Sequence, residues 1–302
     1  MKKFVLNLLI FGVLFFIYDK AFIIFKNLSA DTEVDKRLEL VVTGKMNKDI
    51  IVLGASRGAN NIIAGDIEKE TGKSAYNLGY AASNVEFHEF VLRALLKFNK
   101  APKMVIFPLD DPFELLPTHT QDFRLERLYP LVKYDYINQE LIDRGEKNSL
   151  FSKVFVLHTI NKTNLNLKQK KFTPEDTIMA CGSMPISFQK PGRNWVYEYA
   201  NTTYDVKQEI PAKVKAFKKI IAMCREHHIQ LVFITTPNFR KSNPLFEKRM
   251  REFAGNDIPV YEYNKKNPIY YDKNYFYDES HLNTKGAKIF THEIALYLKD
   301  KI

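Results

Sequence analysis

The sequence predicts an α/β protein in which a mainly parallel, five-stranded sheet lies between two layers of helices, preceded by an N-terminal transmembrane helix. Five short apolar runs have the pattern of strands buried on both faces of a parallel sheet. Helical patterns lie between these runs, and strands that alternate with helices are typical of a doubly wound sheet. A long apolar stretch opens the chain.

The first 26 residues are predicted to form a signal-anchor. Lys2 and Lys3 precede residues 4–18, in which Asn7 is the one strongly polar residue. A basic start followed by an apolar stretch is typical of a secretion signal. No small-x-small cleavage site follows, so we expect an uncleaved, single-pass anchor. An amphipathic or buried N-terminal helix is the alternative.

The charges beside this segment bear on its orientation. Lys2 and Lys3 favour a cytoplasmic N-terminus, and therefore a body on the exported (periplasmic or extracellular) face of the membrane. Lys20 and Lys26 on the other flank weaken that preference. Asp19 is expected near a membrane interface, because the strictly apolar part is shorter than the roughly 20 residues of a spanning helix.

The rest of the chain is predicted to contain a stalk or first helix at residues 27–47 and one domain at residues 48–302. Strands are expected at residues 49–54, 74–78, 103–109, 230–236 and 258–263, and helices at residues 85–98, 214–227 and 284–302. The β-α rhythm is lost at about residues 117–204, which we interpret as one long insertion over the edge of the sheet.

Composition narrows the classes of partner. The net charge of +10 suits a nucleic acid, an anionic membrane surface or an acidic polymer, or simply a basic surface with no dedicated partner. Lys and Arg are scattered along the chain without a nucleic-acid-binding motif, so we expect no nucleic acid. The two cysteines lack metal-ligand spacing, and the sequence predicts neither a metal nor a cofactor.

Ser56 is the first candidate for chemistry. It lies in the segment GASRG, directly after the first predicted strand, where ligands bind in an open parallel sheet. The N–H groups of a following helix can stabilise negative charge that develops beside a nucleophile at this place. Taken alone, a serine in such a turn is more often a helix N-cap.

Asp278 and His281 make the catalytic interpretation of Ser56 the favoured one. They lie in the C-terminal segment DESHLN, and an aspartate three residues before a histidine can orient the imidazole and stabilise its charge. His281 would then activate Ser56. Among the other histidines, His88 lies close to the second strand, and a place near the site is one interpretation of it. A packed or an exposed side chain is the favoured interpretation.

These segments resemble the SGNH, or GDSL-type, hydrolase superfamily. The similarity covers residues 49–302 and rests on four segments, GASR, NLG, the strand at 103–111 and DESHLNTKGA. It implies a flavodoxin-like, three-layer α/β/α fold. It also implies that Ser56 is the nucleophile, His281 the general base and then acid, and Asp278 the orienting carboxylate.

The resemblance is less specific about the donors that would stabilise an oxyanion. Gly79 or the Ala82 amide is a candidate for a backbone donor, and Asn84 for a side-chain donor. The family's usual asparagine after the third strand is absent, and Asp110 occupies that stretch. An ionised aspartate accepts but does not donate a hydrogen bond, so either the donor comes from elsewhere or Asp110 is protonated.

A second departure is the segment GASR, which lacks the Gly-Asp-Ser of many family members. Both departures resemble a membrane-anchored branch of the superfamily that helps to O-acylate exported polysaccharides or teichoic acids, often beside a membrane-bound O-acyltransferase. Arg57 suits that branch, because a guanidinium beside the nucleophile can hold a carboxylate or phosphate of an anionic glycan. A surface salt bridge is an equally good account of Arg57.

Three hypotheses follow for function. The first is a serine esterase or O-acyl(acetyl)transferase that acts on an acylated cell-envelope carbohydrate or a small ester through Ser56, His281 and Asp278. The second is a catalytically silent accessory protein that binds a glycan or an acyltransferase. The third is a flavodoxin-like nucleotide-binding domain, which lacks a glycine-rich phosphate loop.

Overall fold

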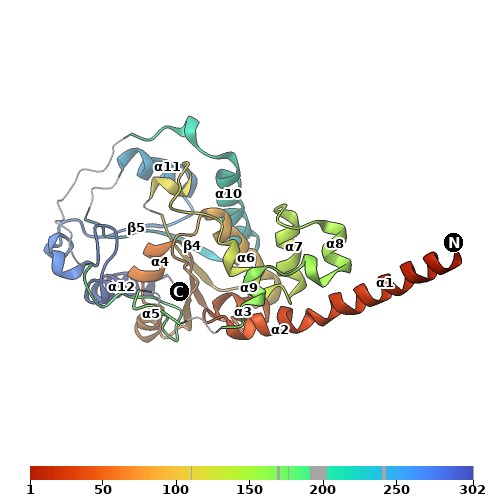
Figure 1. The fold of residues 1–302 in the computed structure, drawn as a ribbon. Helices are drawn as coiled ribbons and strands as arrows, with labels where there is room; N and C mark the ends of the chain where they lie inside the picture. Colours follow the sequence, from red (N-terminus) through yellow and green to blue (C-terminus); the bar gives the residue numbers. More distant parts are fainter. Residues whose placement is uncertain (110, 169–170, 176, 191–202, 240–242, 302) are drawn as a thin grey trace. The chain divides into compact units, whose positions relative to one another are not determined.

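The computed structural model describes residues 1–302 apart from residues 110, 169–170, 176, 191–202, 240–242 and 302 (Figure 1). The chain clusters into two compact units. The N-terminal unit contains Met1–Val42 and Arg124–Lys171, and the sheet unit contains Thr43–Phe123 and Phe172–Ile302. The predicted insertion at 117–204 therefore contributes to both units, and the division into one domain with an insertion stays a prediction.

A five-stranded parallel sheet forms the centre of the sheet unit, which confirms the predicted fold class. Its strands have the order β2-β1-β3-β4-β5, and each neighbouring pair is parallel. They are β1 (Ile50–Val52), β2 (Ala75–Asn77), β3 (Met104–Pro108), β4 (Gln230–Thr235) and β5 (Val260–Glu262). Each strand lies inside one of the predicted apolar runs.

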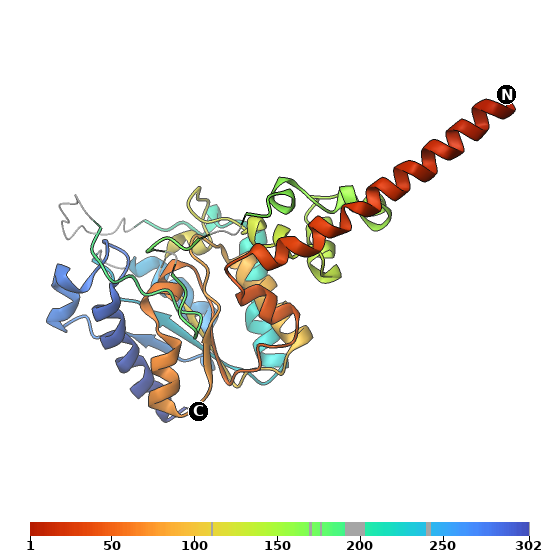
Figure 2. The same ribbon diagram turned by 60° about the horizontal axis from the view of Figure 1, so that its bottom comes forward.

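Helices cover both faces of the sheet. On one face α5 packs against α12, and on the other α6 packs against α10, as Figure 2 shows. The helices of this unit are α4 (Ser56–Asn61), α5 (Ala64–Thr71), α6 (Val85–Phe98), α10 (Pro211–Glu226), α11 (Pro244–Ala254) and α12 (Thr284–Lys299). Short 3-10 helices are η1 (Pro112–Glu114), η5 (Val206–Gln208), η6 (Pro268–Tyr271) and η7 (Lys273–Tyr275).

The alternation of side chains along β3 explains why both faces are covered. Successive residues of a strand point to opposite faces. Met104 and Ile106 belong to the core cluster that contains Phe290 of α12. Phe107 faces the other way and contacts Phe217 of α10, with ring centroids 6.0 Å apart. Burial on both faces is what the continuous apolar run at 103–109 predicts.

The N-terminal unit is helical. It contains α1 (Lys2–Ala21), α2 (Ile23–Thr32), α3 (Arg37–Val42), α7 (Asp135–Asp143), α8 (Ser149–Val154) and α9 (Lys162–Leu165), with the 3-10 helices η2 (Leu125–Arg127), η3 (Tyr129–Leu131) and η4 (Val156–His158). α1 and α2 follow one another closely over Lys2–Thr32, and this stretch is long and apolar enough to cross a membrane. The described residues therefore contain the apolar N-terminal helix that the sequence predicts.

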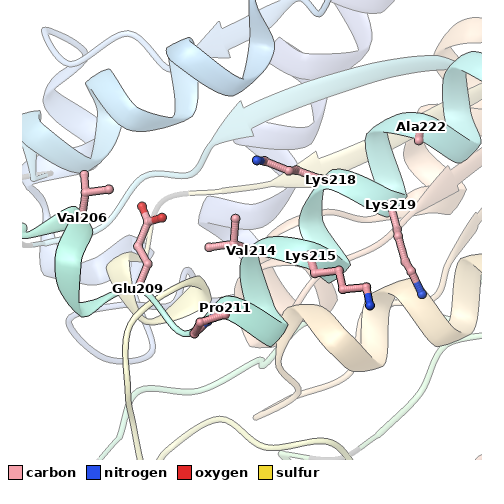
Figure 3. Close-up of a pocket in the computed structure, with 8 residues that line it drawn as sticks. All are labelled: Val206, Glu209, Pro211, Val214, Lys215, Lys218, Lys219 and Ala222. Carbon is pink, nitrogen blue, oxygen red and sulfur yellow. The ribbon is translucent and has the colours of Figure 1, made fainter.

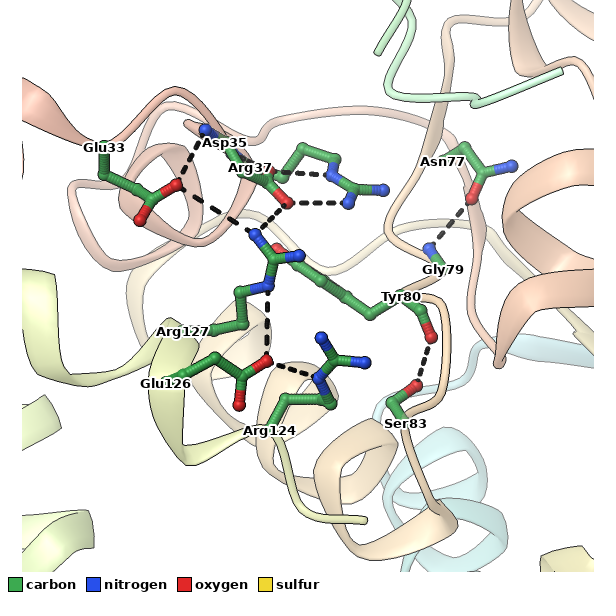
Figure 4. A network of polar contacts seen from close by, with 10 residues as sticks. All are labelled: Glu33, Asp35, Arg37, Asn77, Gly79, Tyr80, Ser83, Arg124, Glu126 and Arg127. Atoms are coloured by element: carbon green, nitrogen blue, oxygen red, sulfur yellow. Dashed lines mark hydrogen bonds and ion pairs between the residues drawn. The ribbon is translucent and has the colours of Figure 1, made fainter. Parts of the chain in front are cut away.

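Buried ion pairs fasten the end of α2 to the chain that returns at η2 (Figure 4). Asp35 binds Arg37 through two hydrogen bonds of 2.9 and 2.7 Å, and Arg127 approaches the same carboxylate within 3.5 Å. Burial acts to raise the pKa of Asp35, but the Arg37 guanidinium outweighs it and lowers that pKa below its ordinary value. The charge of Arg37 is thereby balanced inside the unit.

Candidate active site

Ser56 lies at the start of α4, immediately beyond the carboxyl end of β1. The turn that carries it is tight. Gly54 has a φ of +120°, and a Cβ at Gly58 would lie 2.7 Å from the carbonyl oxygen of Leu53. Both glycines are thus required by the backbone that presents Ser56. The position agrees with the sequence prediction of a serine in a strand-to-helix turn.

The structure brings Ser56 together with both other residues of the predicted triad. The Oγ atom of Ser56 lies 2.8 Å from Nε2 of His281. Nδ1 of the same ring lies 2.8 Å from Oδ1 of Asp278. Ser56 is half-buried, and the side chains of His281 and Asp278 keep 19% and 14% of their surface exposed. A small ligand can therefore reach the three groups from solvent.

The charge of Asp278 sets the direction of these hydrogen bonds. Burial acts to raise the pKa of Asp278, but hydrogen bonding and charge attraction from His281, with N–H groups of Ser280 and His281, lower it below its ordinary value. The carboxylate is therefore ionised at neutral pH and only accepts. Nδ1–H of a neutral His281 ring donates to it, so Nε2 accepts the hydroxyl proton of Ser56.

The loop that carries His281 is held immediately after the histidine. The Leu282 N–H donates to Oδ1 of Asn61 at 2.9 Å, which ties the loop to the end of α4. Asn283 caps α12 by accepting from the N–H groups of Lys285 and Gly286. A Cβ at Gly286 would lie 2.3 Å from the carbonyl oxygen of Tyr275, which explains the glycine in the segment LNTKGA.

Of the two backbone candidates for an oxyanion donor, Gly79 is already engaged. Its N–H donates to Oδ1 of Asn77 at 2.8 Å (Figure 4). Ala82 differs, because within the described part of the chain its N–H makes no hydrogen bond, and its φ of +57° is unusual for a residue other than glycine. The Tyr80 N–H binds the Gly54 carbonyl at 2.9 Å, which places the start of this loop beside the turn of Ser56.

The structure gives Asn84 and Arg57 other contacts. Oδ1 of Asn84 accepts from the N–H of Phe87 and caps α6, so this oxygen has a structural use. Arg57 lies 3.8 Å from Asp111, which is the ion-pair alternative raised from sequence. Asp110 lies outside the described residues, and its predicted effect on an oxyanion stays a prediction.

Asn77 is a buried residue whose importance the sequence analysis missed. Its side-chain amide donates to the carbonyls of Gly58 and Ile62, both at 2.8 Å, on either side of α4. Its own N–H donates to the carbonyl of Cys181 at 2.8 Å. Because α4 starts at Ser56, Asn77 fixes the helix that presents this serine. An asparagine at the end of a predicted strand was the available signal.

Residues 179–186, within the predicted insertion, contact this scaffold through a turn and the short stretch that follows it. In the turn, the Gly182 N–H donates to the carbonyl of Met179 at 2.8 Å. The Met184 N–H donates to the carbonyl of Ala59, and Thr284 donates to the carbonyl of Ile186, both at 2.8 Å. Oγ of Ser183 accepts from the Ala64 N–H at 2.9 Å. This segment thus contacts α4, the start of α5 and the start of α12.

His88 is packed beneath the loop after β2, which decides between the packed and the exposed side chain that the sequence left open. Its ring is 1% exposed, contacts Phe107 edge-on, and places Nε2 2.7 Å from Oγ of Ser83. Oγ of Ser83 donates to the Tyr80 carbonyl at 2.6 Å, so it accepts from Nε2–H. Burial lowers the pKa of His88 to about 3, and the neutral ring lies 4.0 Å from Glu114.

A cavity of about 670 Å³ lies on α10 and the chain before it, and Figure 3 shows its side chains. None of the three triad residues lines it. The lining residues are Val206, Glu209, Pro211, Val214, Lys215, Lys218, Lys219 and Ala222. The described residues also contain no group of three or more histidine, cysteine or acidic side chains placed to hold a metal ion.

Comparisons with known proteins leave the family open. No family model matches the chain. No curated protein matches it either. Among solved structures it is similar to a "putative acylhydrolase" from Bacteroides fragilis NCTC 9343, at 10% sequence identity and a TM-score of 0.40, over 88% of this chain and 94% of that chain.

Proposed function

We propose that the chain is a membrane-anchored serine hydrolase or acyltransferase of the SGNH type, acting on an acyl ester of an exported cell-envelope carbohydrate. The observation that carries the proposal is the continuous pair of 2.8 Å hydrogen bonds from Ser56 to His281 and from His281 to Asp278. Resemblance of the segments around these residues supports the SGNH type, and the apolar helix supports the anchor.

The proposed reaction follows from these contacts. Oγ of Ser56 attacks the ester carbonyl carbon while its proton passes to Nε2 of His281, and Asp278 stabilises the imidazolium that results. When the bond to the alcohol breaks, Nε2 returns the proton to the leaving oxygen and an acyl-serine remains. Water, or a sugar hydroxyl, then repeats the sequence in reverse and frees Ser56.

The oxyanion of the tetrahedral intermediate needs donors that are not otherwise bonded. We propose that the Ala82 N–H, which makes no hydrogen bond within the described residues, is one of them. The Gly79 N–H is engaged by Asn77 and is the poorer candidate. A loop held in a left-handed conformation at a reactive site is a recognised form of such preorganisation.

The test uses the full chain in detergent with p-nitrophenyl acetate and a fluorophosphonate probe. Wild type is expected to turn over the ester and to be labelled, while Ser56→Ala and His281→Ala lose labelling and at least about 10³-fold in kcat. Ser280→Ala is the matched control, because this serine supplies a backbone N–H to Asp278, which alanine retains.

Two outcomes would redirect the proposal. A folded wild type that neither reacts nor takes the probe contradicts the enzyme and favours the silent accessory protein. Labelling that survives in Ser56→Ala contradicts the assignment of the nucleophile. If the enzyme is active, mass spectrometry of an added oligosaccharide separates transfer, which adds an acyl group, from hydrolysis, which releases the free acid.

A further inference from the structure

The short helix α8 exposes apolar side chains and buries a polar one, which is the reverse of a helix on a water-exposed surface. Leu150, Phe151 and Val154 are 69%, 45% and 46% exposed, and they lie at positions i, i+1 and i+4, on one side of the helix. Ser152 lies on the other side, is buried, and donates to the carbonyl of His158. The α8 face, defined as Leu150, Phe151 and Val154, therefore presents apolar surface outward.

The α8 face is continuous with the apolar N-terminal helix, in the same compact unit. A chain of aromatic contacts runs from Phe15 of α1 to Phe155, with ring centroids 5.8 Å apart, and on to Phe151 at 6.3 Å. Asp19 of α1 accepts hydrogen bonds of 2.9 Å from the N–H groups of Val156 and Leu157. The acidic residue within the apolar stretch is thus buried by the turn that follows α8.

The hydrogen bonds to Asp19 also fix the position of α8 along the axis of α1. Asp19 lies 17 residues beyond Lys2. At a rise of 1.5 Å per residue this stretch is about 26 Å long, close to the hydrocarbon thickness of a bilayer. If α1 spans a membrane, α8 lies where the helix leaves the hydrocarbon.

The charge of this segment suits an anionic surface. Residues 148–168 contain three lysines, Lys153, Lys162 and Lys168, and no aspartate or glutamate. Lys153 follows Ser152 in α8, and it is exposed, as are Lys162 and Lys168. Exposed apolar side chains accompanied by lysines alone are typical of elements that lie in the headgroup region of anionic membranes.

We propose that the α8 face is a second membrane contact, inserted at the acyl-chain boundary of an anionic lipid bilayer beside α1. The proposal rests on the membrane-anchor part of the proposed function, and it is independent of the reaction at Ser56. A protein partner is the competing occupant, but the exposed lysines of residues 148–168, which include no acidic residue, and the continuity with α1 favour lipid. The contact holds the N-terminal unit against the bilayer. A single membrane-spanning helix without it would let the unit rotate about the helix axis.

The experiment places a fluorescent label at Leu150→Cys in the full chain, reconstituted in phosphatidylglycerol nanodiscs. Cys181 and Cys224 are first replaced, because both are free thiols. Some lipids carry a nitroxide near the top of the acyl chain. The label at position 150 is expected to emit at shorter wavelength than in water and to lose most of its intensity to that nitroxide. In phosphatidylcholine discs the loss is expected to be smaller.

Two control positions make each outcome decisive. A label at Val13→Cys, inside α1, must be quenched if the anchor is in the bilayer, so its failure refutes the anchor rather than the α8 contact. A label at Asp31→Cys, 12 residues beyond Asp19, must show the emission of a label in water.

Quenching at position 13 but not at position 150 overturns the proposal. A blue shift at 150 without nitroxide quenching overturns the lipid as occupant and indicates a second copy of the chain. Equal quenching in both lipids overturns the preference for anionic lipid.

Discussion

At the scale of single residues, the site depends on which groups hold protons. Asp278 is ionised because its hydrogen bonds outweigh the effect of burial, and its negative charge selects the ring tautomer of His281 that accepts from Ser56. His88, a few residues beyond the loop after β2, is instead kept neutral by burial. Asp278 is therefore present in its charged form, and His88 in its neutral form.

Replacing Asp278 by asparagine tests the tautomer argument. The amide introduced by Asp278→Asn can donate to Nδ1 and so favour the wrong ring tautomer, and kcat is expected to fall by about 10⁴ with little change in KM. Steady-state ester hydrolysis measures both constants. Asp272→Asn, a change at an exposed cap of η7, is the control and should retain wild-type kcat. An active Asp278→Asn variant would contradict the orienting role.

The lowered pKa of Asp278 also gives the direction of an acid effect on stability. Its folded pKa lies below the ordinary 3.8, so its contribution is fully present above about pH 4 and is lost as the pH falls further. Circular dichroism between pH 5 and pH 2 should therefore show a steeper acid loss of stability in wild type than in Asp278→Asn. Parallel curves would show that the carboxylate is not stabilised in the folded state.

His88 predicts a second, separate dependence on pH. Its folded pKa of about 3 lies below the ordinary 6.5, so only the unfolded chain takes up a proton between these values. The free energy of unfolding should fall by about 1.4 kcal/mol per pH unit below pH 6.5, and recover above it. The amide of His88→Gln can still donate to Ser83. The difference in unfolding free energy between pH 7.5 and pH 5, measured by urea unfolding, should lack this contribution in the variant. An unchanged slope in the variant would contradict a neutral, buried His88.

The sequence predicted the triad but not the residues that position it. Ser56, Asp278 and His281 are recognisable because each lies in a short motif beside a strand end or helix start. Asn77 was not assigned a role, because its partners Gly58 and Cys181 are 19 residues before it and more than 100 after it. The positive φ of Ala82 could not be predicted from the sequence either, since alanine does not indicate a left-handed turn as glycine does.

At the scale of elements, β2 and residues 179–186 together fix α4. The predicted strands were correct because each lies in a short, largely apolar run, and β1 and β3 are buried on both faces. The helix α6 begins and ends where its periodicity predicts. Residues 179–186 have no such period, because they form a turn and an irregular stretch that bond mainly through their backbone. Only the fold shows that they belong to the scaffold of the site.

Within residues 179–186, Gly182 is the position at which a substitution is expected to destabilise the protein most. A Cβ there would lie 2.2 Å from the carbonyl oxygen of Asn77, and its φ is +81°. Gly145 has a similar φ of +77° but nothing within 4 Å, so Gly145→Ala measures backbone strain alone. We expect Gly145→Ala to cost about 1 kcal/mol of unfolding free energy and Gly182→Ala about 3 kcal/mol. Urea unfolding measures both, and equal losses would show that the segment yields without strain.

At the scale of the whole molecule, the apolar helix is the feature that would attach the protein to a membrane. Its side chains from Phe4 to Tyr18 are largely exposed, so the N-terminal unit itself does not bury them. Apolar surface of this extent in water is a strong driving force for insertion into a bilayer. The proposed reaction would then be carried out by a protein that is attached to a membrane.

Membrane fractionation tests the anchor directly. The full chain is expected to remain in the membrane pellet after washing with alkaline carbonate, which strips peripheral proteins. Leu9→Asp with Leu14→Asp, two charges near the centre of the helix, should shift it to the supernatant, because each costs about 3 kcal/mol at that depth. Leu150→Asp should not, since the helix alone retains the protein. Release of the wild type by carbonate would contradict the anchor.

The distance along the chain between Ser56 and His281 has a consequence for biosynthesis. The two residues are 225 positions apart, so a growing chain exposes the serine long before its base has been translated. Asn283 and α12, which hold the His281 loop, follow later still along the chain. A product that is terminated before residue 281 therefore carries the proposed nucleophile without its proposed base, and the proposed ester cleavage can start only after His281 has been synthesised.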